Sequence, residues 1–254
     1  MGTHKPAYEG GGQAVRIIQS TIMDAIIKET LGIWKLALTE EQTAKLELFK
    51  EELLEKNSRF NLVSSNDAGD LWPRHILDAL AGAPLLTRLL KPGDRIADAG
   101  AGAGFPGIPL AVALESAAFD LWDSSLKRSM FLTCAVSRLK LKNVRALHMR
   151  IGQSGPLETG KYDTVVERAM GKLENILPQC LNMIKSGGFF LAWQTAAQLA
   201  QERPAAREAA RKAGAELAET ASYRLPGEKE DRFILAFKKV ITGLGVQTAG
   251  SEAV

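Results

Sequence analysis

The chain has 254 residues, of which 46% are hydrophobic and 24% are charged, and its net charge is +3. This composition is typical of a soluble globular protein, and the length suits one domain or one domain with an appendage. So small a net charge does not by itself indicate nucleic-acid binding. No transmembrane span or secretory signal is expected, because no apolar run approaches ~18 residues and residues 1–13 are polar and glycine-rich. Cys134 and Cys180 are expected to pack rather than to react, so neither a disulfide framework nor a metal site is predicted. We therefore expect a cytoplasmic protein that does not associate with a membrane.

The first 93 residues are predicted to be mostly helical. Thr39 begins the clearest helix, because Gln42 three residues later completes a capping box. Its apolar side chains Leu46, Phe49 and Leu53 share one face. The other predictions for this region are disorder over residues 1–15, a helix of uncertain docking over 15–36, a polar turn over 57–70, a helix over 71–80 and helix breakers at Pro84, Pro92 and Gly93.

From residue 95, short apolar runs alternate with helical segments. The predicted strands are residues 95–98, 119–122, 144–148, 163–166, 188–193 and 231–237, and the predicted helices are 107–114, 125–140, 172–184 and 201–213. This alternation predicts an α/β fold with a mostly parallel sheet that is covered on both faces. The last strand follows a Leu-Pro-Gly turn at 225–227, so it is the one that can return antiparallel. A ligand is expected at the carboxyl ends of the strands.

A glycine-rich turn follows the first of these strands, with the sequence DAGAGAGFPGIP over residues 98–109. Such a turn between a strand and a helix exposes backbone N–H groups to a nucleotide-like ligand. The spacing of Gly102, Gly104 and Gly107 matches the dinucleotide fingerprint, whereas Asp98 followed by Gly100, Gly102 and Gly104 matches the turn of S-adenosylmethionine-dependent methyltransferases. A carboxylate at residue 98 suits a cationic amino acid better than an anionic pyrophosphate. The turn therefore favours the methyl donor.

The segment after residue 122 carries an acidic and a basic signal. Asp123 ends the second predicted strand and is expected to accept hydrogen bonds from ribose hydroxyls, its alternative role being the N-cap of the next helix. No further acidic residue occurs before Glu158. The basic residues of this segment are Lys127, Arg128, Arg138, Lys140, Lys142, Arg145 and Arg150. They are expected either to contact phosphates or to form a solvated helix face.

Five segments of the chain together resemble the RsmG (GidB) family of small-subunit ribosomal RNA methyltransferases. They are Asn61-Leu62, Arg74–Asp78, the turn Gly100–Pro109, Asp123–Arg128 and Arg168-Ala169. The run GFPGIPL at residues 104–110 is the most specific of the matches. The resemblance extends from about residue 31 to residue 239.

The resemblance implies a Rossmann-like class I methyltransferase with a mostly parallel seven-stranded sheet and an N-terminal helical extension. It implies transfer of a methyl group from S-adenosyl-L-methionine to N7 of the 16S rRNA guanine at position 527, with 16S rRNA or the small ribosomal subunit as partner. It divides the chain into a variable, partly disordered extension over residues 1–30, a helical region over 31–93, the methyltransferase domain over 94–240 and a flexible tail over 241–254. We expect a monomer.

The resemblance also assigns residues to the site. The expected donor-binding residues are Gly100, Phe105, Ile151, Gly152 and Arg168, together with Asp98, Gly102, Gly104 and Asp123 from the turn and the second strand. The expected RNA-binding residues are Arg74, His75, Lys127, Arg128 and Arg168. No general base is assigned, because guanine N7 has a free lone pair and loses no proton, so that catalysis rests on alignment of the reacting atoms.

Three positions depart from the usual family pattern. Gly152 stands where the family has an acidic residue, Glu167 where it has serine or threonine, and Gln194 where it has lysine. Glu167 is expected near the RNA path, where its carboxylate would repel phosphates or pin Arg168, and Gln194 is expected to replace a cation that faces RNA. Two alternatives therefore stay open on the same fold, a small-molecule methyltransferase and an RNA-binding or ribosome-assembly factor that has lost turnover.

Overall fold

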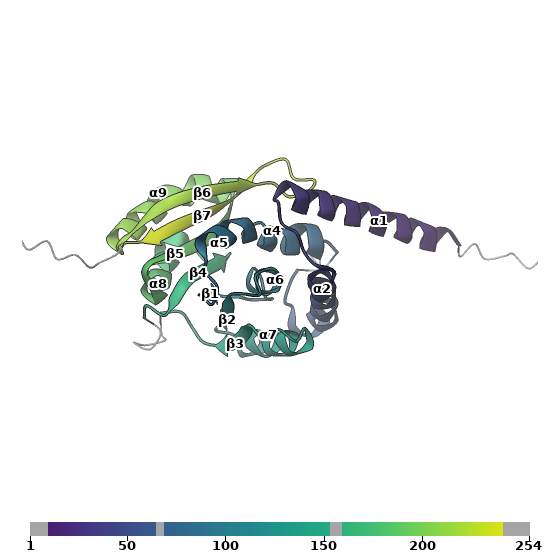
Figure 1. Cartoon of the computed structure of the whole chain (residues 1–254), viewed down its shortest axis with the longest axis horizontal. Coiled ribbons are helices and arrows are strands. Elements are labelled where there is room, and N and C mark those ends of the chain that lie inside the picture. The colour runs from purple at the N-terminus through teal and green to yellow at the C-terminus, as the bar shows by residue number, and fades with distance from the viewer. Residues whose placement is uncertain (1–9, 65–68, 153–158, 241–254) are drawn as a thin grey trace, which may run out of the picture.

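The computed structural model describes residues 10–64, 69–152 and 159–240, and its centre is a seven-stranded sheet (Figure 1). The strand order is β3-β2-β1-β4-β5-β7-β6. Strands β1 to β5 pair in parallel, whereas β7 runs antiparallel to both β5 and β6. The strands are β1 Arg95–Ala99, β2 Ala118–Asp123, β3 Val144–His148, β4 Tyr162–Arg168, β5 Ile184–Thr195, β6 Ala215–Tyr223 and β7 Arg232–Lys239. The predicted α/β fold with a mostly parallel sheet and an antiparallel last strand is confirmed.

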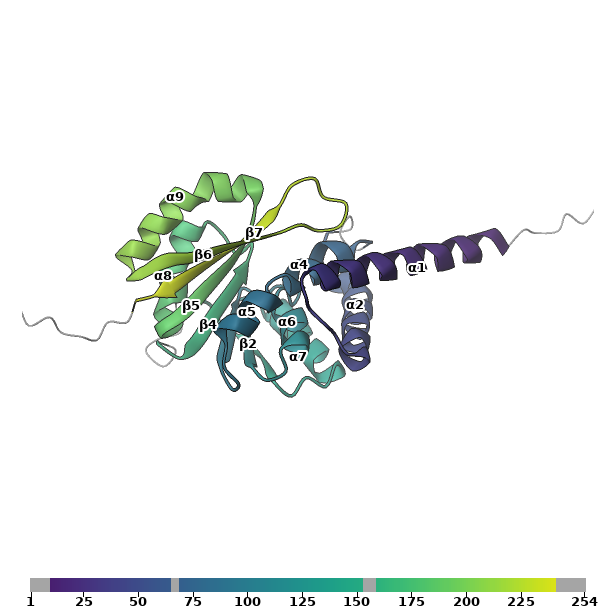
Figure 2. The ribbon, with the colours of Figure 1, turned by 45° about the horizontal axis from the view of Figure 1, so that its top comes forward.

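Helices cover both faces of this sheet (Figure 2). Helices α8 (Leu173–Met183) and α9 (Ala196–Lys212) pack on one face. The other face is covered by α2 (Glu40–Phe60), α4 (Leu77–Leu80), α5 (Ala83–Leu89), α6 (Gly107–Ala113) and α7 (Leu126–Arg138). The apolar face predicted for α2 is confirmed, since Leu46, Phe49 and Leu53 are fully buried in this second layer. No helix among the described residues has both the length and the apolar character that crossing a membrane requires.

The N-terminal region differs from the expectation in its boundaries. Helix α1 spans Gly10–Ile33 and extends away from the body of the protein (Figure 1), so residues 10–15 are helical rather than disordered. The expected disorder of residues 1–9 and of the tail over 241–254 lies outside the described residues. Helix α2 continues to Phe60, beyond the start of the expected turn. Pro84 does not end a helix but sits in the first turn of α5, where its missing N–H costs nothing.

Besides α5, two elements were not expected from the sequence. The first turn of the predicted helix over residues 71–80 is a π-helix, η1 (Trp72–Ile76), which leads directly into α4. The second is the edge strand β6, whose sequence AELAETASY has no continuous apolar run. This segment is a strand because it pairs with β7. Most of its residues are only partly buried or exposed, which explains why it has no continuous apolar run. Cys134, which was expected to pack, is exposed, whereas Cys180 is buried as expected.

The strand order places a topological switch point between β1 and β4. From β1 the sheet continues through β2 and β3 in one direction, and from β4 it continues through β5 in the other. Crossovers that leave the sheet in opposite directions open a crevice at the carboxyl ends of the two central strands, which is where ligands bind in such folds. The glycine-rich turn follows β1 and Arg168 ends β4, so both lie at this crevice.

Candidate active site

The glycine-rich turn is held against the end of β2. The backbone N–H of Gly102 donates to Oδ2 of Asp123 at 2.9 Å, and that of Ala101 donates to the carbonyl oxygen of Trp122 at 2.8 Å. Gly100 has a φ of +70°, and a Cβ atom there would lie 2.9 Å from Cγ of Met170. A side chain at residue 100 is therefore disfavoured both by the backbone and by the space.

Asp98 lies beneath the turn rather than on its open side. Its side chain is fully buried, and Oδ2 accepts a hydrogen bond from the backbone N–H of Gly107 at 2.7 Å. Its second carboxylate oxygen, Oδ1, has no hydrogen-bond partner among the described residues. Burial raises the pKa of Asp98 to about 7, although the hydrogen bond from Gly107 acts in the opposite direction. Direct contact of Asp98 with a cationic donor therefore stays a prediction.

A first cavity of about 710 Å³ opens at the carboxyl ends of β1, β2 and β4. Its lining residues are Gly100, Trp122, Asp123, Ser124, Arg128, Met149, Arg150, Ile151, Gly152, Ala169, Met170, Ile176 and Gln179. The structure thus brings together four of the predicted donor-binding residues, Gly100, Asp123, Ile151 and Gly152. Pockets of this size suit a ligand as large as a nucleoside derivative.

Asp123 is fixed in this cavity from two sides. Besides the hydrogen bond from Gly102, its Oδ1 accepts one from the backbone N–H of Ser125 at 2.7 Å. The N-cap of α7 is Ser125, whose side chain accepts from the N–H of Arg128, so the alternative role of Asp123 as the N-cap is wrong. The carboxylate is preorganised at the end of β2, where ribose hydroxyls are bound in related folds.

A second cavity of about 310 Å³ adjoins the first, and Ala169 lines both. The residues around it are Arg74, His75, Asp78, Arg168, Ala169, Trp193, Gln194, Thr195, Gln198, Tyr223 and Arg232. Three of the predicted RNA-binding residues, Arg74, His75 and Arg168, therefore meet here. Asp78, Trp193, Tyr223 and Arg232 were not among the predicted site residues. The sequence signal for Asp78 was a lone carboxylate in the apolar run ILDAL.

Phe105 holds Arg168 rather than lining the first cavity. Its ring lies 5.3 Å from that of Phe49 and 5.2 Å from that of His75, and only 4% of the residue is exposed. The guanidinium of Arg168 lies 5.0 Å above the same ring, a cation–π contact. Gly104 makes this close packing possible, because a Cβ there would lie 3.1 Å from Cζ of Phe49. Contact of Phe105, Gly102 or Gly104 with the donor stays a prediction. The same holds for Arg168, which lines the second cavity and not the first.

The expectation for Glu167 is wrong. Its side chain is fully buried, and Oε2 accepts a hydrogen bond from the backbone N–H of Met170 at 3.2 Å. Arg168 is not pinned by Glu167, since it donates to Asp78 at 2.8 Å and makes a 3.0 Å hydrogen bond with Nδ1 of His75. Gln194 is also buried, with 5% exposed, and it lines the second cavity, so its expected position facing the RNA stays a prediction.

The basic cluster of the sequence is divided in the structure. Arg128 lies 3.8 Å from Asp123, and both Arg128 and Arg150 line the first cavity. Arg138 instead pairs with Glu52 at 2.9 Å, and Arg145 pairs with Asp120 at 2.7 Å. The structure thus does not gather these residues in one patch, and the RNA contact of the exposed Lys127 stays a prediction.

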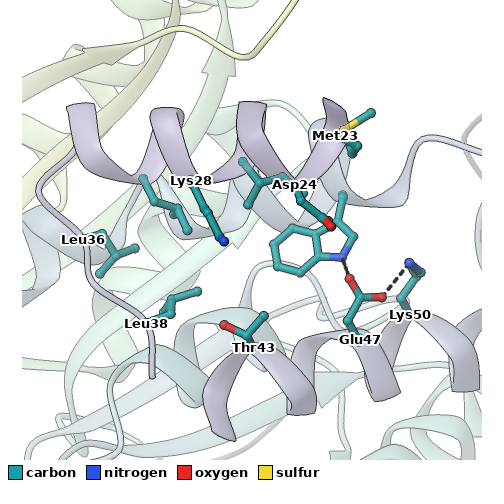
Figure 3. Close-up of a pocket in the computed structure, with 11 residues that line it drawn as sticks. Met23, Asp24, Lys28, Leu36, Leu38, Thr43, Glu47 and Lys50 are labelled. Atoms are coloured by element: carbon teal, nitrogen blue, oxygen red, sulfur yellow. Dashed lines mark hydrogen bonds and ion pairs between the residues drawn. The ribbon is translucent and has the colours of Figure 1, made fainter. Parts of the chain in front are cut away.

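A third cavity, of about 740 Å³, lies between α1 and α2, away from the switch point. Figure 3 shows Met23, Asp24 and Lys28 on one side and Thr43, Glu47 and Lys50 on the other. Lys50 pairs with Glu47 at 2.6 Å, so two of these charges are already neutralised. None of the predicted site residues lines this cavity.

Replacing Glu167 with glutamine is expected to remove a pH-dependent loss of stability. Burial raises the pKa of Glu167 from its ordinary value of 4.5 to about 8, with smaller opposing contributions. The folded chain therefore retains a proton that the unfolded chain releases, and the stability of the wild type falls as the pH rises from about 4.5 to about 8. The difference in unfolding free energy between Glu167→Gln and the wild type should grow across this range, by on the order of a few kcal/mol, and stay constant above it. Denaturant titrations at several pH values measure it, and a constant difference at all pH values contradicts the prediction.

The sequence of this chain is similar to those of known ribosomal RNA methyltransferases. A family model described as GidB, rRNA small subunit methyltransferase G, matches residues 42–228. Ribosomal RNA small subunit methyltransferase G of Alkaliphilus oremlandii is 35% identical over 218 residues, covering 85% of this chain and 90% of that protein. The protein of the same name from Lachnoclostridium phytofermentans is 34% identical over 205 residues, covering 80% and 84%.

Solved structures show the same fold at low sequence identity. An S-adenosylmethionine-dependent O-methyltransferase from Thermotoga maritima is 18% identical, covers 66% of each chain and has a TM-score of 0.51. An S-adenosylmethionine-dependent methyltransferase from Aquifex aeolicus is 17% identical and also has a TM-score of 0.51, covering 63% of this chain and 91% of that one. The fold is thus that of class I methyltransferases. Because the family model matches most of its length and the two relatives are 35% and 34% identical to it, the chain belongs to the rRNA small subunit methyltransferase G family.

Proposed function

We propose that this chain transfers the methyl group of S-adenosyl-L-methionine to N7 of one guanine in 16S rRNA, the guanine at position 527. The observation that carries the proposal is the pair of adjoining cavities at the switch point, which share Ala169. The first takes the methyl donor and the second takes the target base. The donor's sulfonium and the base then meet at the boundary between them.

The residues of the first cavity fit a nucleoside with an amino acid tail. Asp123 supplies fixed carboxylate oxygens for the ribose hydroxyls, and Gly100 leaves the space that a Cβ would fill. Gly152 has a φ of +80° and lines the cavity next to Ile151, in the position expected beside the adenine. When bound, S-adenosyl-L-methionine supplies an electrophilic methyl group on a sulfonium. Membership of the family and the class I fold support this choice of donor.

Methylation of guanine N7 requires the protein mainly to align the donor methyl group with the base. The lone pair of guanine N7 attacks the methyl carbon, the carbon–sulfur bond breaks, and no proton leaves the base. The chain's own residues need only hold the two reactants in line, with the reacting atoms ~3–3.5 Å apart. The base must leave its stack to enter the second cavity. Three arginines, Arg74, Arg168 and Arg232, line this cavity with one carboxylate, Asp78, so its lining is net positive and suits RNA. Of these, Arg232 is also paired with Glu228 at 2.6 Å.

Mapping of methylated nucleotides tests the proposal. Small ribosomal subunits and naked 16S rRNA from cells that lack this chain are incubated with the purified protein and S-adenosyl-L-methionine carrying a labelled methyl group. We expect 7-methylguanosine at one position of the RNA, located by mass mapping. Labelling of a small metabolite without labelling of RNA would favour a small-molecule methyltransferase. Salt-sensitive RNA binding without methyl transfer at saturating donor would favour an assembly factor.

A further inference from the structure

A buried carboxylate lies at the centre of the second cavity's wall. Asp78 on α4 is 1% exposed, and its Oδ2 accepts a hydrogen bond from Arg168 at 2.8 Å. Its Oδ1 accepts from the hydroxyl of Tyr223 and, at 3.2 Å, from Arg232. The indole N–H of Trp193 donates a hydrogen bond to the backbone carbonyl oxygen of Asp78 at 2.8 Å. One residue of the helical region thus binds the ends of β4 and β5, the last residue of β6 and the first residue of β7.

Arg168 also contacts the aromatic cluster behind the glycine-rich turn, which consists of Phe49, His75 and Phe105. Its guanidinium lies over the ring of Phe105, makes a hydrogen bond with His75 and lines the second cavity next to Ala169. An arginine has a long side chain with many rotamers, and its planar group acts on a ligand only from a fixed orientation. Asp78 provides the charge-assisted hydrogen bond that fixes this orientation.

We propose that Asp78 is a positioning residue for methyl transfer, which holds the Arg168 guanidinium toward the target nucleotide without itself contacting donor or RNA. The inference rests on the proposed function, because it assigns the second cavity to the RNA. Both Asp78 and Arg168 line the second cavity and neither lines the first, so loss of Asp78 should leave donor binding intact. Its effect should fall on the rate of transfer.

The contacts of Asp78 are also compatible with a role in stability alone. A second buried aspartate, Asp120, provides a matched control for that role. Asp120 on β2 is 3% exposed and, like Asp78, is bound by two arginines and one tyrosine. Arg95 and Arg145 each donate to it at 2.7 Å, and the hydroxyl of Tyr162 donates at 2.8 Å. Asp120 lines neither the first nor the second cavity. Removing its charge breaks an equivalent network away from the site.

The experiment compares Asp78→Asn with Asp120→Asn in the full-length protein. Melting temperature, donor affinity by calorimetry, and kcat and KM for methylation of small subunits are measured for each. Both variants are expected to lose thermal stability, because each removes the charge of a buried, paired carboxylate. Asp78→Asn should keep donor affinity within ~3-fold of the wild type and lower kcat by ~10–100-fold, the effect of weakening one or two charge-assisted hydrogen bonds. Asp120→Asn should keep kcat once folded.

A double variant separates positioning from general damage. Arg168→Lys removes the group that Asp78 positions, so Asp78→Asn combined with Arg168→Lys should be no slower than Arg168→Lys alone. The inference is overturned if the two single effects multiply, if Asp120→Asn lowers kcat as much as Asp78→Asn, or if Asp78→Asn transfers methyl at the wild-type rate. A wild-type protein that labels no RNA would instead refute the proposed function and this inference with it.

Discussion

Replacing Gly100 with aspartate is expected to abolish binding of S-adenosyl-L-methionine. Gly100 has a φ of +70°, so any side chain strains the backbone, and its Cβ would push Met170 from a contact of 2.9 Å. Met170 itself lines the first cavity, so its displacement narrows the space for the donor. We expect the affinity measured by calorimetry to fall by at least ~100-fold, or about 2.7 kcal/mol.

The control is the same substitution at another glycine of similar conformation. Gly214 has a φ of +74°, has open space at its Cβ position and lines neither cavity of the site. Gly214→Asp should cost stability through backbone strain but should bind the donor as the wild type does. Equal donor affinity of the Gly100→Asp protein and the wild type, with both folded by circular dichroism, would rule out the first cavity as the donor site.

Replacing Phe105 with alanine is expected to destabilise the protein and to slow methyl transfer. The ring is nearly completely buried between Phe49, His75 and the guanidinium of Arg168. Removal of a buried phenylalanine ring costs about 3–5 kcal/mol, which corresponds to roughly 6–20 °C in melting temperature for a chain of this size. Arg168 also loses the surface on which it lies, so kcat on RNA should fall further than stability explains.

Phe131→Ala provides the comparison for this second prediction. Phe131 on α7 is 2% exposed in the same core and lines neither cavity of the site. It should lower the melting temperature by a similar amount and leave kcat unchanged at a temperature where the protein is folded. If Phe105→Ala and Phe131→Ala have the same kcat, the aromatic cluster stabilises the fold without supporting Arg168.

Features with a local cause were predictable from the sequence. The glycine-rich turn, the strands of the parallel sheet and the capping box at Thr39 each follow from residue types a few positions apart. Thr195 and Gln198 form the same capping box at the start of α9, so the first turn of that helix could have been found in the same way. The sequence prediction began this helix five residues later.

Features that depend on distant partners were not predictable. The strand β6 is rich in alanine and glutamate and becomes a strand only by pairing with β7. Asp78 pairs with Arg168, which is 90 residues away in the sequence, and with Arg232, which is 154 residues away. The wrong expectation that Glu167 lies near the RNA path could have been avoided from local geometry, because successive residues of a strand point to opposite faces of the sheet. With Arg168 directed to the second cavity, its neighbour had to point away from it.

The two cavities also differ in when their walls become available during synthesis. Every residue that lines the first cavity lies between Gly100 and Gln179, whereas the second requires Tyr223 and Arg232 near the end of the described chain. Chains are made from the N-terminus, and β7, which lies between β5 and β6 in the sheet, is the last of the described strands to be synthesised. A nascent chain therefore contains all the lining residues of the first cavity before it can complete the second. On the proposed assignment of the cavities, the residues that receive the target base are thus completed after those that bind the donor.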